Sequence, residues 1–170
     1  MKKYELTTET LQIGGFTLHR IKAVKDFDSI KAGELGGWIE NEKNLSQDNN
    51  AWIYSEAMAF DNANVFGNAK VYGNADIKGN AKVYGNADIK GDAKVHDAVD
   101  YIVFKNFWSS GRYFTWTRSD NKWSVGCFYG TGEELIKKAY ADSEKSGREY
   151  ERVVRYVESI LADEKKEKSD

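Results

Sequence analysis

Residues 51–98 read AWIYSE AMAFDN ANVFGN AKVYGN ADIKGN AKVYGN ADIKGD AKVHDA when they are written six at a time. Alanine opens each of the eight hexads, and the third place holds Ile or Val in seven of them. A period of six fits the two-residue period of a β-strand and does not fit the 3.6-residue period of a helix. Gly-Asn, which tolerates positive φ, recurs at one phase and supplies corners. The segment therefore predicts short strands joined by turns, with Ala and Val or Ile facing a narrow interior.

The repeat resembles the hexapeptide repeat of left-handed parallel β-helices, in which three hexads form one triangular coil and each residue stacks on the residue 18 places later. Outward charges test this spacing independently. A separation of 18 places Asp88 over Lys70, whereas a separation of 12 would place Lys82 over Lys70. The same spacing of 18 pairs Asp76 with Lys94. Like charges directly opposite destabilise a sheet by on the order of 0.2–1 kcal/mol, so the charges favour three hexads per coil.

Outward aromatic residues stack under the same rule. We expect Tyr54 on Tyr72, Phe66 on Tyr84, and Trp52 against Lys70. The array is short, and its open ends would expose unpaired backbone groups, so the flanking segments are expected to cap it. The outward aromatic surface and the resemblance together favour a homo-oligomer, most simply a trimer.

The segments on either side of the repeat predict two further structural units. Gly14-Gly15 lies between two apolar alternations and predicts a β-hairpin. Downstream, three strands over 101–107, 112–118 and 122–128 precede two helices, one opened by the capping box at Thr131 and one starting near Ser146. The expected fold is mainly β: an N-terminal hairpin and turn-rich lead-in over 1–38, a short left-handed β-helix over 39–98, a C-terminal α+β cap of three strands and two helices over 99–162, and a charged tail over 163–170.

Composition excludes several classes of function. The chain of 170 residues has 25 Lys and Arg against 27 Asp and Glu, a net charge of -2, so no general basic surface predicts double-stranded nucleic acid or membrane binding. We find no apolar run that would span a membrane or form a signal peptide. The single cysteine, Cys127, excludes an internal disulfide and fits a cytoplasmic location. Two histidines and one cysteine without ligand spacing predict no metal site.

Segments outside the repeat carry a second resemblance. The sequences GGWIE at 36–40, GCFYGT at 126–131 and GREY at 147–150, together with the repeat, are similar to small hexapeptide-repeat proteins of bacteriophages and prophages. That resemblance implies a non-enzymatic binding or interaction protein that blocks or sequesters a host component, such as part of an antiviral defence. Its expected partners are copies of itself and a host protein or a nucleotide-like ligand, with no cofactor.

The alternative function is acyl transfer from acyl-CoA, because the best-known hexapeptide proteins are acyltransferases. Such enzymes resemble one another in using a histidine as general base, in a cleft between subunits of a trimer, with the acyl donor along the helix. His96 is the candidate, since it faces outward on the last coil, beside Asp97 and over Lys78. His19, on the hairpin, is expected to be an ordinary strand residue. Cys127 has no activating base nearby in sequence and is expected to be a small core residue.

The strongest candidate binding residues lie on the second C-terminal strand. Even spacing places Arg112, Phe114, Trp116 and Arg118 on one face. That face could stack a base or another aromatic group while an arginine pairs with a carboxylate or phosphate. The other interpretation makes Phe114 and Trp116 core residues with the arginines extending from the edge of the sheet.

The repeat makes a direct prediction about stability. Val83→Asp should bury an unpaired charge and unfold the β-helix, at a cost of several kcal/mol. Lys82→Asp, one residue earlier and facing outward, is the matched control and should be tolerated. Circular dichroism during thermal unfolding measures both variants, and a folded Val83→Asp protein with an unchanged melting temperature would refute the inward assignment.

Overall fold

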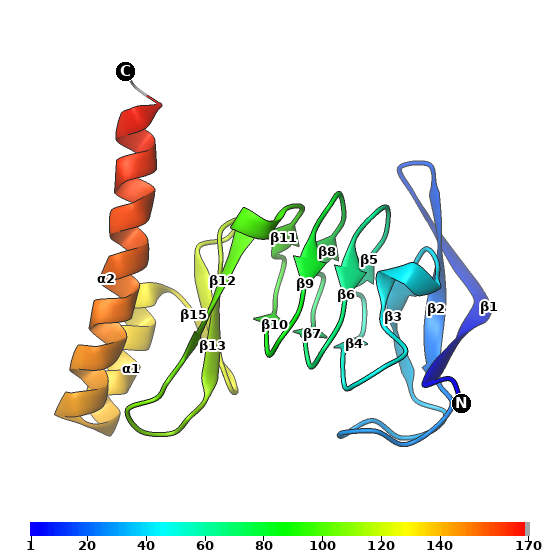
Figure 1. Cartoon of the computed structure of the whole chain (residues 1–170), viewed down its shortest axis with the longest axis horizontal. Helices are drawn as coiled ribbons and strands as arrows, with labels where there is room; N and C mark the ends of the chain where they lie inside the picture. Colours follow the sequence, from blue (N-terminus) through cyan, green and yellow to red (C-terminus); the bar gives the residue numbers. More distant parts are fainter. Residues whose placement is uncertain (169–170) are drawn as a thin grey trace.

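The eight hexads form the coils of a left-handed β-helix in the computed structural model, which describes residues 1–168 (Figure 1). Each hexad contributes one two-residue strand: β4 (Trp52–Ile53), β5 (Met58–Ala59), β6 (Asn64–Val65), β7 (Lys70–Val71), β8 (Asp76–Ile77), β9 (Lys82–Val83), β10 (Asp88–Ile89) and β11 (Lys94–Val95). Strands three hexads apart pair in parallel, with Lys70 opposite Asp88 and Asp76 opposite Lys94. The spacing of 18 predicted from the charges is therefore confirmed.

The three faces of the coils are separate sheets, β4-β7-β10, β6-β9, and β5-β8-β11, the last of which continues through β3 into the N-terminal strands. Val71, Ile77, Val83 and Ile89 are 0% exposed, as predicted, and they pack with the repeated alanines. Two observations explain why glycine occupies the corners of the coils. At Gly73, φ is 70°, and a Cβ atom there would lie 2.8 Å from the carbonyl oxygen of Gly91 in the next coil.

The outward aromatic stacks form as predicted in two of three places. Tyr54 and Tyr72 stack with ring centroids 4.3 Å apart, and Phe66 and Tyr84 stack at 5.1 Å. Trp52 lies in register with Lys70, but it is fully buried because the N-terminal segment covers it, with Tyr4 and Phe27 edge-on to its ring. Trp52 thus faces outward from the coil as expected, but it adds nothing to an exposed surface, because the sequence did not show which coil face the cap covers.

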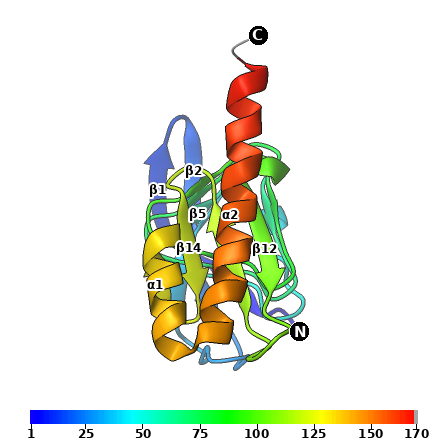
Figure 2. The ribbon, with the colours of Figure 1, turned by 90° about the vertical axis from the view of Figure 1, so that its left-hand side faces the viewer.

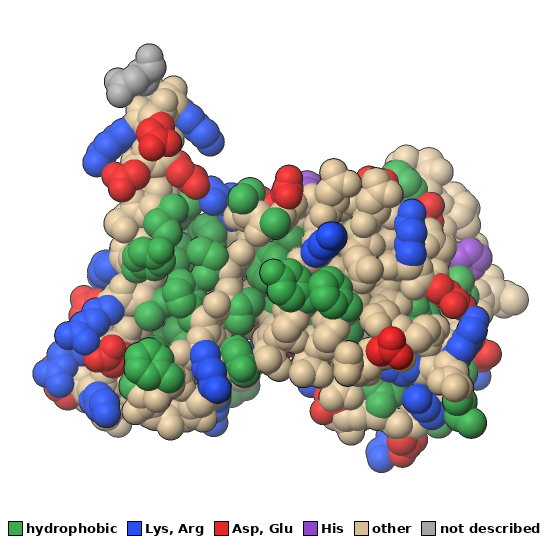
Figure 3. Space-filling model, viewed as in Figure 1, with side chains coloured by type: hydrophobic (Ala, Val, Ile, Leu, Met, Phe, Trp, Pro, Cys, Tyr) green, Lys and Arg blue, Asp and Glu red, His purple; other side chains and the backbone are tan. Residues whose placement is uncertain are grey.

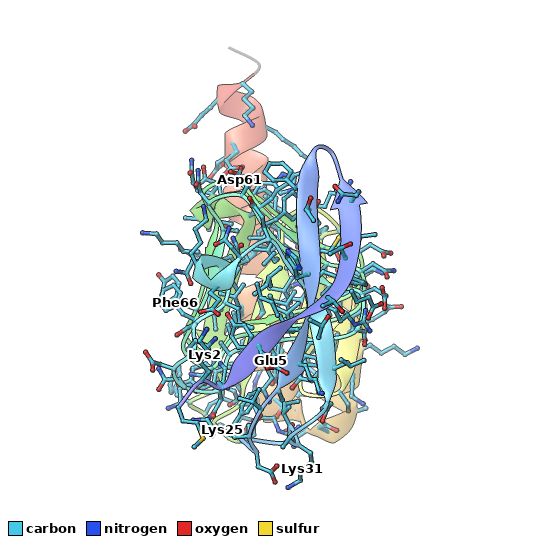
Figure 4. The ribbon with its side chains drawn as sticks, turned by 90° about the vertical axis from the view of Figure 1, so that its right-hand side faces the viewer. Lys2, Glu5, Lys25, Lys31, Asp61 and Phe66 are labelled. Carbon is cyan, nitrogen blue, oxygen red and sulfur yellow. The ribbon has the colours of Figure 1, made fainter. Side chains whose placement is uncertain are left out.

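The N-terminal cap is the predicted hairpin, followed by a third strand. β1 (Tyr4–Ile13) and β2 (Phe16–Ala23) turn at Gly14 and Gly15, whose φ values are 52° and 88°. β2 pairs antiparallel with β3 (Leu35–Ile39), which pairs in parallel with β5 and so joins the cap to the first coil. A short 3-10 helix, η1 (Glu42–Asn44), precedes the coils. Viewed from this end, the hairpin crosses the stack (Figure 4).

The first coil exposes backbone carbonyl groups, because each coil donates its N–H groups to the carbonyls of the next coil, as Trp52 does to Ala69. Lys3 satisfies several of these carbonyls from the cap. Its ammonium donates to the carbonyl oxygen of Ala51 at 2.7 Å and lies 3.4 Å from those of Asp48 and Asn49. The residue is 1% exposed, and burial lowers the pKa of Lys3 to about 8.

The C-terminal cap has four strands where the sequence predicted three. A short 3-10 helix, η2 (Ala98–Asp100), leads into β12 (Tyr101–Lys105), β13 (Tyr113–Thr117), β14 (Lys122–Val125) and β15 (Phe128–Gly130), an antiparallel meander in chain order. The segment predicted as one strand over 122–128 is broken by Gly126, whose φ of 55° allows a tight turn. Cys127 lies in this turn and is exposed, so its assignment as a core residue was wrong.

Two helices cover the outer face of this sheet (Figure 2). α1 (Gly132–Asp142) has the predicted capping box between Thr131 and Glu134. α2 (Glu144–Glu167) is capped by Ser143, three residues before the predicted start. It also continues five residues past Ala162, where we expected the charged tail to begin, and in this stretch Glu164 pairs with Arg118 and Asp163 pairs with Lys166. Residues 169–170 of that tail lie outside the described residues. No helix within residues 1–168 is long and apolar enough to cross a membrane.

The inner face of the C-terminal sheet closes the last coil, where backbone N–H groups lack a following coil. The Thr115 hydroxyl accepts from the N–H of Asp88 at 3.0 Å, and the Ser119 hydroxyl accepts from the N–H of Lys94 at 2.7 Å. The molecule is thus built of consecutive layers: N-terminal hairpin, β-helix, sheet and helices (Figure 1).

Lys3 gives a prediction about the N-terminal cap. Lys3→Met keeps the length of the side chain but removes the donors to three carbonyl groups, and should lower the free energy of unfolding by about 1–3 kcal/mol at pH 7. Lys2→Met is the control, because Lys2 is exposed and pairs with Glu42 at the surface. Denaturant unfolding measures both variants. Equal stability of the two would contradict the capping role.

The lowered pKa of Lys3 adds a dependence on pH. Between about pH 8 and pH 10 the unfolded chain keeps a proton that the folded protein has lost, so stability rises with pH through this window. The difference in unfolding free energy between the wild type and Lys3→Met should therefore grow from pH 8 to pH 10. A constant difference would show that Lys3 has an ordinary pKa.

Candidate functional site

His96 and Asp76 form a pair on the outer surface of the β5-β8-β11 face. His96 directly follows β11. Its Nε2 atom is buried, has no hydrogen-bond partner among the described residues, and lies 3.9 Å from Oδ2 of Asp76, within ion-pair range but too far for a hydrogen bond. The Asp76 side chain is 19% exposed and the His96 side chain 42%. Lys78 also reaches this carboxylate, with its ammonium 3.5 Å from Oδ2. The sequence predicted that His96 stacks over Lys78, and it missed the contact with Asp76.

The backbone around His96 is held by Asp100. The N–H groups of His96 and Asp97 donate to Oδ2 of Asp100 at 2.8 and 2.9 Å, while Asp97 caps η2. Within residues 1–168, Nδ1 of His96 has no hydrogen-bond partner. An imidazole with one nitrogen facing a carboxylate and the other open can accept a proton at the open nitrogen, which is the requirement for a general base.

The other sequence candidates for chemistry lie apart from this pair. His19 is on β2, with Nδ1 3.3 Å from the carbonyl oxygen of Thr7 on the neighbouring strand, as expected for an ordinary strand residue. Cys127 is on the β14–β15 turn of the C-terminal cap. The structure therefore joins neither residue to His96.

The four candidate binding residues on and beside β13 do not form one exposed face. Phe114 and Trp116 are 0% and 1% exposed, in the core between the sheet and the helices. Arg118 forms a two-point ion pair with Glu164 of α2, at 2.7 and 3.2 Å, and also donates to the carbonyl oxygen of Val99. The hydrogen bonds from Arg118 lower the pKa of Glu164. This geometry matches the other interpretation given by the sequence, in which the aromatics are core residues. The ligand-binding role stays a prediction for Arg112.

Arg112 lines a groove between the β-helix and the C-terminal sheet, with a volume of about 610 Å³. The β-helix side of the groove contains Asn68, Lys70, Tyr72 and Asp88. The sequence reveals part of this side, because the stacking rule of 18 places Lys70 beside Asp88, but it does not show that the C-terminal cap folds back against it.

A second groove, of about 440 Å³, lies around the same corner on the β6-β9 face. It shares Asn86 and Tyr113 with the first groove and is lined by Tyr84, Tyr101 and Val103. Apolar side chains gather beside β9 and β12, and the molecule is notched between its two lobes (Figure 3). The corner of the coils at Asn86 is thus flanked by a charged groove and an aromatic groove.

The repeat, the coils and the 18-residue register show that this chain has a hexapeptide-repeat β-helix fold. It is 41% identical over 69 residues to a protein of Escherichia coli (strain K12) described as "Uncharacterized acetyltransferase YdcK". The match covers 35% of this chain and 21% of that relative, so the chain spans about a fifth of the relative's length. No protein-family model matches the chain.

The contrast between the two arginines can be tested by stability. Arg118→Ala removes the ion pair with Glu164 and should lower the melting temperature by about 2–4 °C, while Arg112→Ala should leave it unchanged, because Arg112 has no ion-pair or hydrogen-bond partner for its guanidinium within residues 1–168. Differential scanning calorimetry measures both variants. A larger loss for Arg112→Ala than for Arg118→Ala would contradict this assignment.

Proposed function

We propose that this chain transfers an acyl group from an acyl-CoA thioester to a small amine or hydroxyl acceptor, with His96 as the general base. The His96–Asp76 pair, which joins the last two coils, carries the proposal. The partial similarity to a protein named as an acetyltransferase supports acyl transfer over the binding role that the phage resemblance implied.

The proposed step uses the two nitrogens of His96 differently. Nε2 faces Asp76, which would orient the ring and stabilise it when it is protonated. Nδ1 would take the proton from the acceptor as its oxygen or nitrogen attacks the thioester carbonyl carbon. The carbon–sulfur bond then breaks, and the CoA thiolate leaves and takes up the proton from the imidazolium. The acceptor gains the acyl group, and His96 returns to its neutral form.

Lys78 completes the surroundings of this carboxylate, because its ammonium lies 3.5 Å from the same Oδ2 atom of Asp76 that faces the imidazole. The fixed backbone at Asp97 and Asp100 holds the ring over this carboxylate.

Acyl transfer should be tested by measuring release of the CoA thiol from acetyl-CoA and longer acyl-CoA esters, in the presence of a panel of amines and amino sugars. We expect release that depends on the acceptor, and a loss of about 10²–10⁴-fold on His96→Ala. Asp76→Asn should reduce the rate less, because it removes the orienting charge and leaves the base in place.

His19→Ala is the matched control, since it removes the other histidine of the chain and should leave the rate unchanged. Folding of every variant should be checked by circular dichroism. Full activity of a folded His96→Ala protein would eliminate His96 as the base. The absence of thiol release with every donor and acceptor would count against acyl transfer itself.

A further inference from the structure

The charged groove between the β-helix and the C-terminal sheet carries an inference that does not depend on acyl transfer. It lies beside the β4-β7-β10 face, whereas His96 belongs to the β5-β8-β11 face. Its volume of about 610 Å³ falls within the range of roughly 300–1,000 Å³ typical of small-molecule sites. The groove is therefore a separate candidate site.

The charges of the groove leave one cation without a partner. Lys70 pairs with Asp28 at 2.6 Å, which lowers the pKa of Asp28 through that hydrogen bond. Lys90, at the margin, donates its ammonium to the carbonyl oxygen of Gly126. Arg112 also lines the groove, and its guanidinium has no such partner within residues 1–168. A guanidinium with its fork of donors open is suited to bind a carboxylate or phosphate in two-point fashion.

Acceptor groups also line the groove. Asp88 is directly opposite Lys70 in the register, and its carboxylate has no hydrogen-bond donor among the described residues. Burial raises the pKa of Asp88, as expected for a carboxylate with reduced access to water. At the corner, Asn68 donates its amide to the side-chain oxygen of Asn86 at 3.4 Å, which leaves the amide of Asn86 as an open donor. Such a set of acceptors and donors suits hydroxyl groups, which can both donate and accept.

Tyr113 supplies a ring at the end of the groove. It is 40% exposed, and the ammonium of Lys105 lies 5.7 Å from its ring centroid. Because Tyr113 lines both grooves, a ligand bound at Arg112 can also lie against its ring. The groove thus combines an unpaired arginine, a carboxylate without a hydrogen-bond donor, an amide and an aromatic ring.

We propose that this groove binds an anionic sugar, that is, a polyhydroxylated molecule with one phosphate or carboxylate group. Arg112 binds the anionic group, Asp88 and Asn86 bind hydroxyl groups, and Tyr113 contacts the sugar ring. A neutral sugar lacks the group that Arg112 binds, and a simple anion lacks the hydroxyls that Asp88 and Asn86 bind. Both parts of the ligand are therefore required.

The test is isothermal titration calorimetry of the full chain, without any acyl donor, against several probes. Ribose 5-phosphate, glucose 6-phosphate, glucuronate and adenosine monophosphate separate phosphate from carboxylate and a plain sugar from a nucleotide. Ribose, glucose and inorganic phosphate test each half of the ligand alone. We expect at least one anionic sugar to bind with a dissociation constant below about 1 mM, and each half alone to bind at least about 10-fold more weakly.

Variants locate the binding. Arg112→Ala should weaken binding of the anionic sugar by at least about 10-fold, and Asp88→Asn should weaken it while leaving any binding of inorganic phosphate unchanged. Arg148→Ala removes an exposed arginine on α2 and is the matched control. Circular dichroism confirms that the variants are folded.

Three results would overturn the proposal. The first is the absence of binding by all anionic sugars at about 10 mM, and the second is inorganic phosphate or a neutral sugar binding as tightly as the anionic sugar. The third is unchanged binding by Arg112→Ala. Because no acyl donor is present, each of these results leaves the His96 proposal untouched, and loss of acyl transfer would leave this one untouched.

Discussion

Hydrogen bonding between coils has a direction, and the rest of the structure depends on it. Each coil donates its backbone N–H groups to the carbonyls of the coil that follows, as Trp52 does to Ala69 and Lys70 does to Ala87. A finite stack therefore ends in carbonyl groups on the N-terminal side and in N–H groups on the C-terminal side. Buried backbone groups of either kind need a partner, so the two caps must differ chemically. Lys3 supplies donors at one end, and the hydroxyl oxygens of Thr115 and Ser119 supply acceptors at the other.

The need for caps also explains where the grooves lie. Because Thr115 and Ser119 must contact the last coil, β13 and its neighbours are held against the β-helix, and the ends of this sheet overhang the coil corner at Asn86. Arg112 and Tyr113 lie at the start of β13, just beyond the part that contacts the coil. The C-terminal sheet, which is required for stability, thus places Arg112 beside the outward residues of β7 and β10. Arg112 has no ion-pair partner among the described residues. The His96 pair arises differently, from the coils alone, since Asp76 and His96 lie on adjacent coils of the same face.

The sequence determined the repeating part of the fold because periodicity, charge pairing and side-chain size all act locally. Val83 and Lys70 could be assigned an orientation from their place in a hexad. The caps were harder to predict because their contacts join distant segments: nothing in the repeat shows that Phe27 and Tyr4 cover Trp52, or that Gly126 divides a strand. For the sites, the spacing of 18 gives the position of His96 on the last coil, but not the rotamer that turns it toward Asp76. Arg112 and Arg118 are equivalent in the strand pattern, and only α2, through Glu164, distinguishes them.

Each complete coil takes 18 residues, so the distance between the two caps can change only in fixed steps. Each coil of 18 residues adds one strand spacing, about 4.8 Å, and returns the chain to the same face. An insertion or deletion of whole coils would change the separation of the caps without rotating one against the other, whereas a single hexad would turn the C-terminal layer by about a third of a revolution. The β-helix can therefore act as a molecular ruler. Homologous chains of different length could present the same two caps at different distances, with the grooves lengthened or shortened in equal steps.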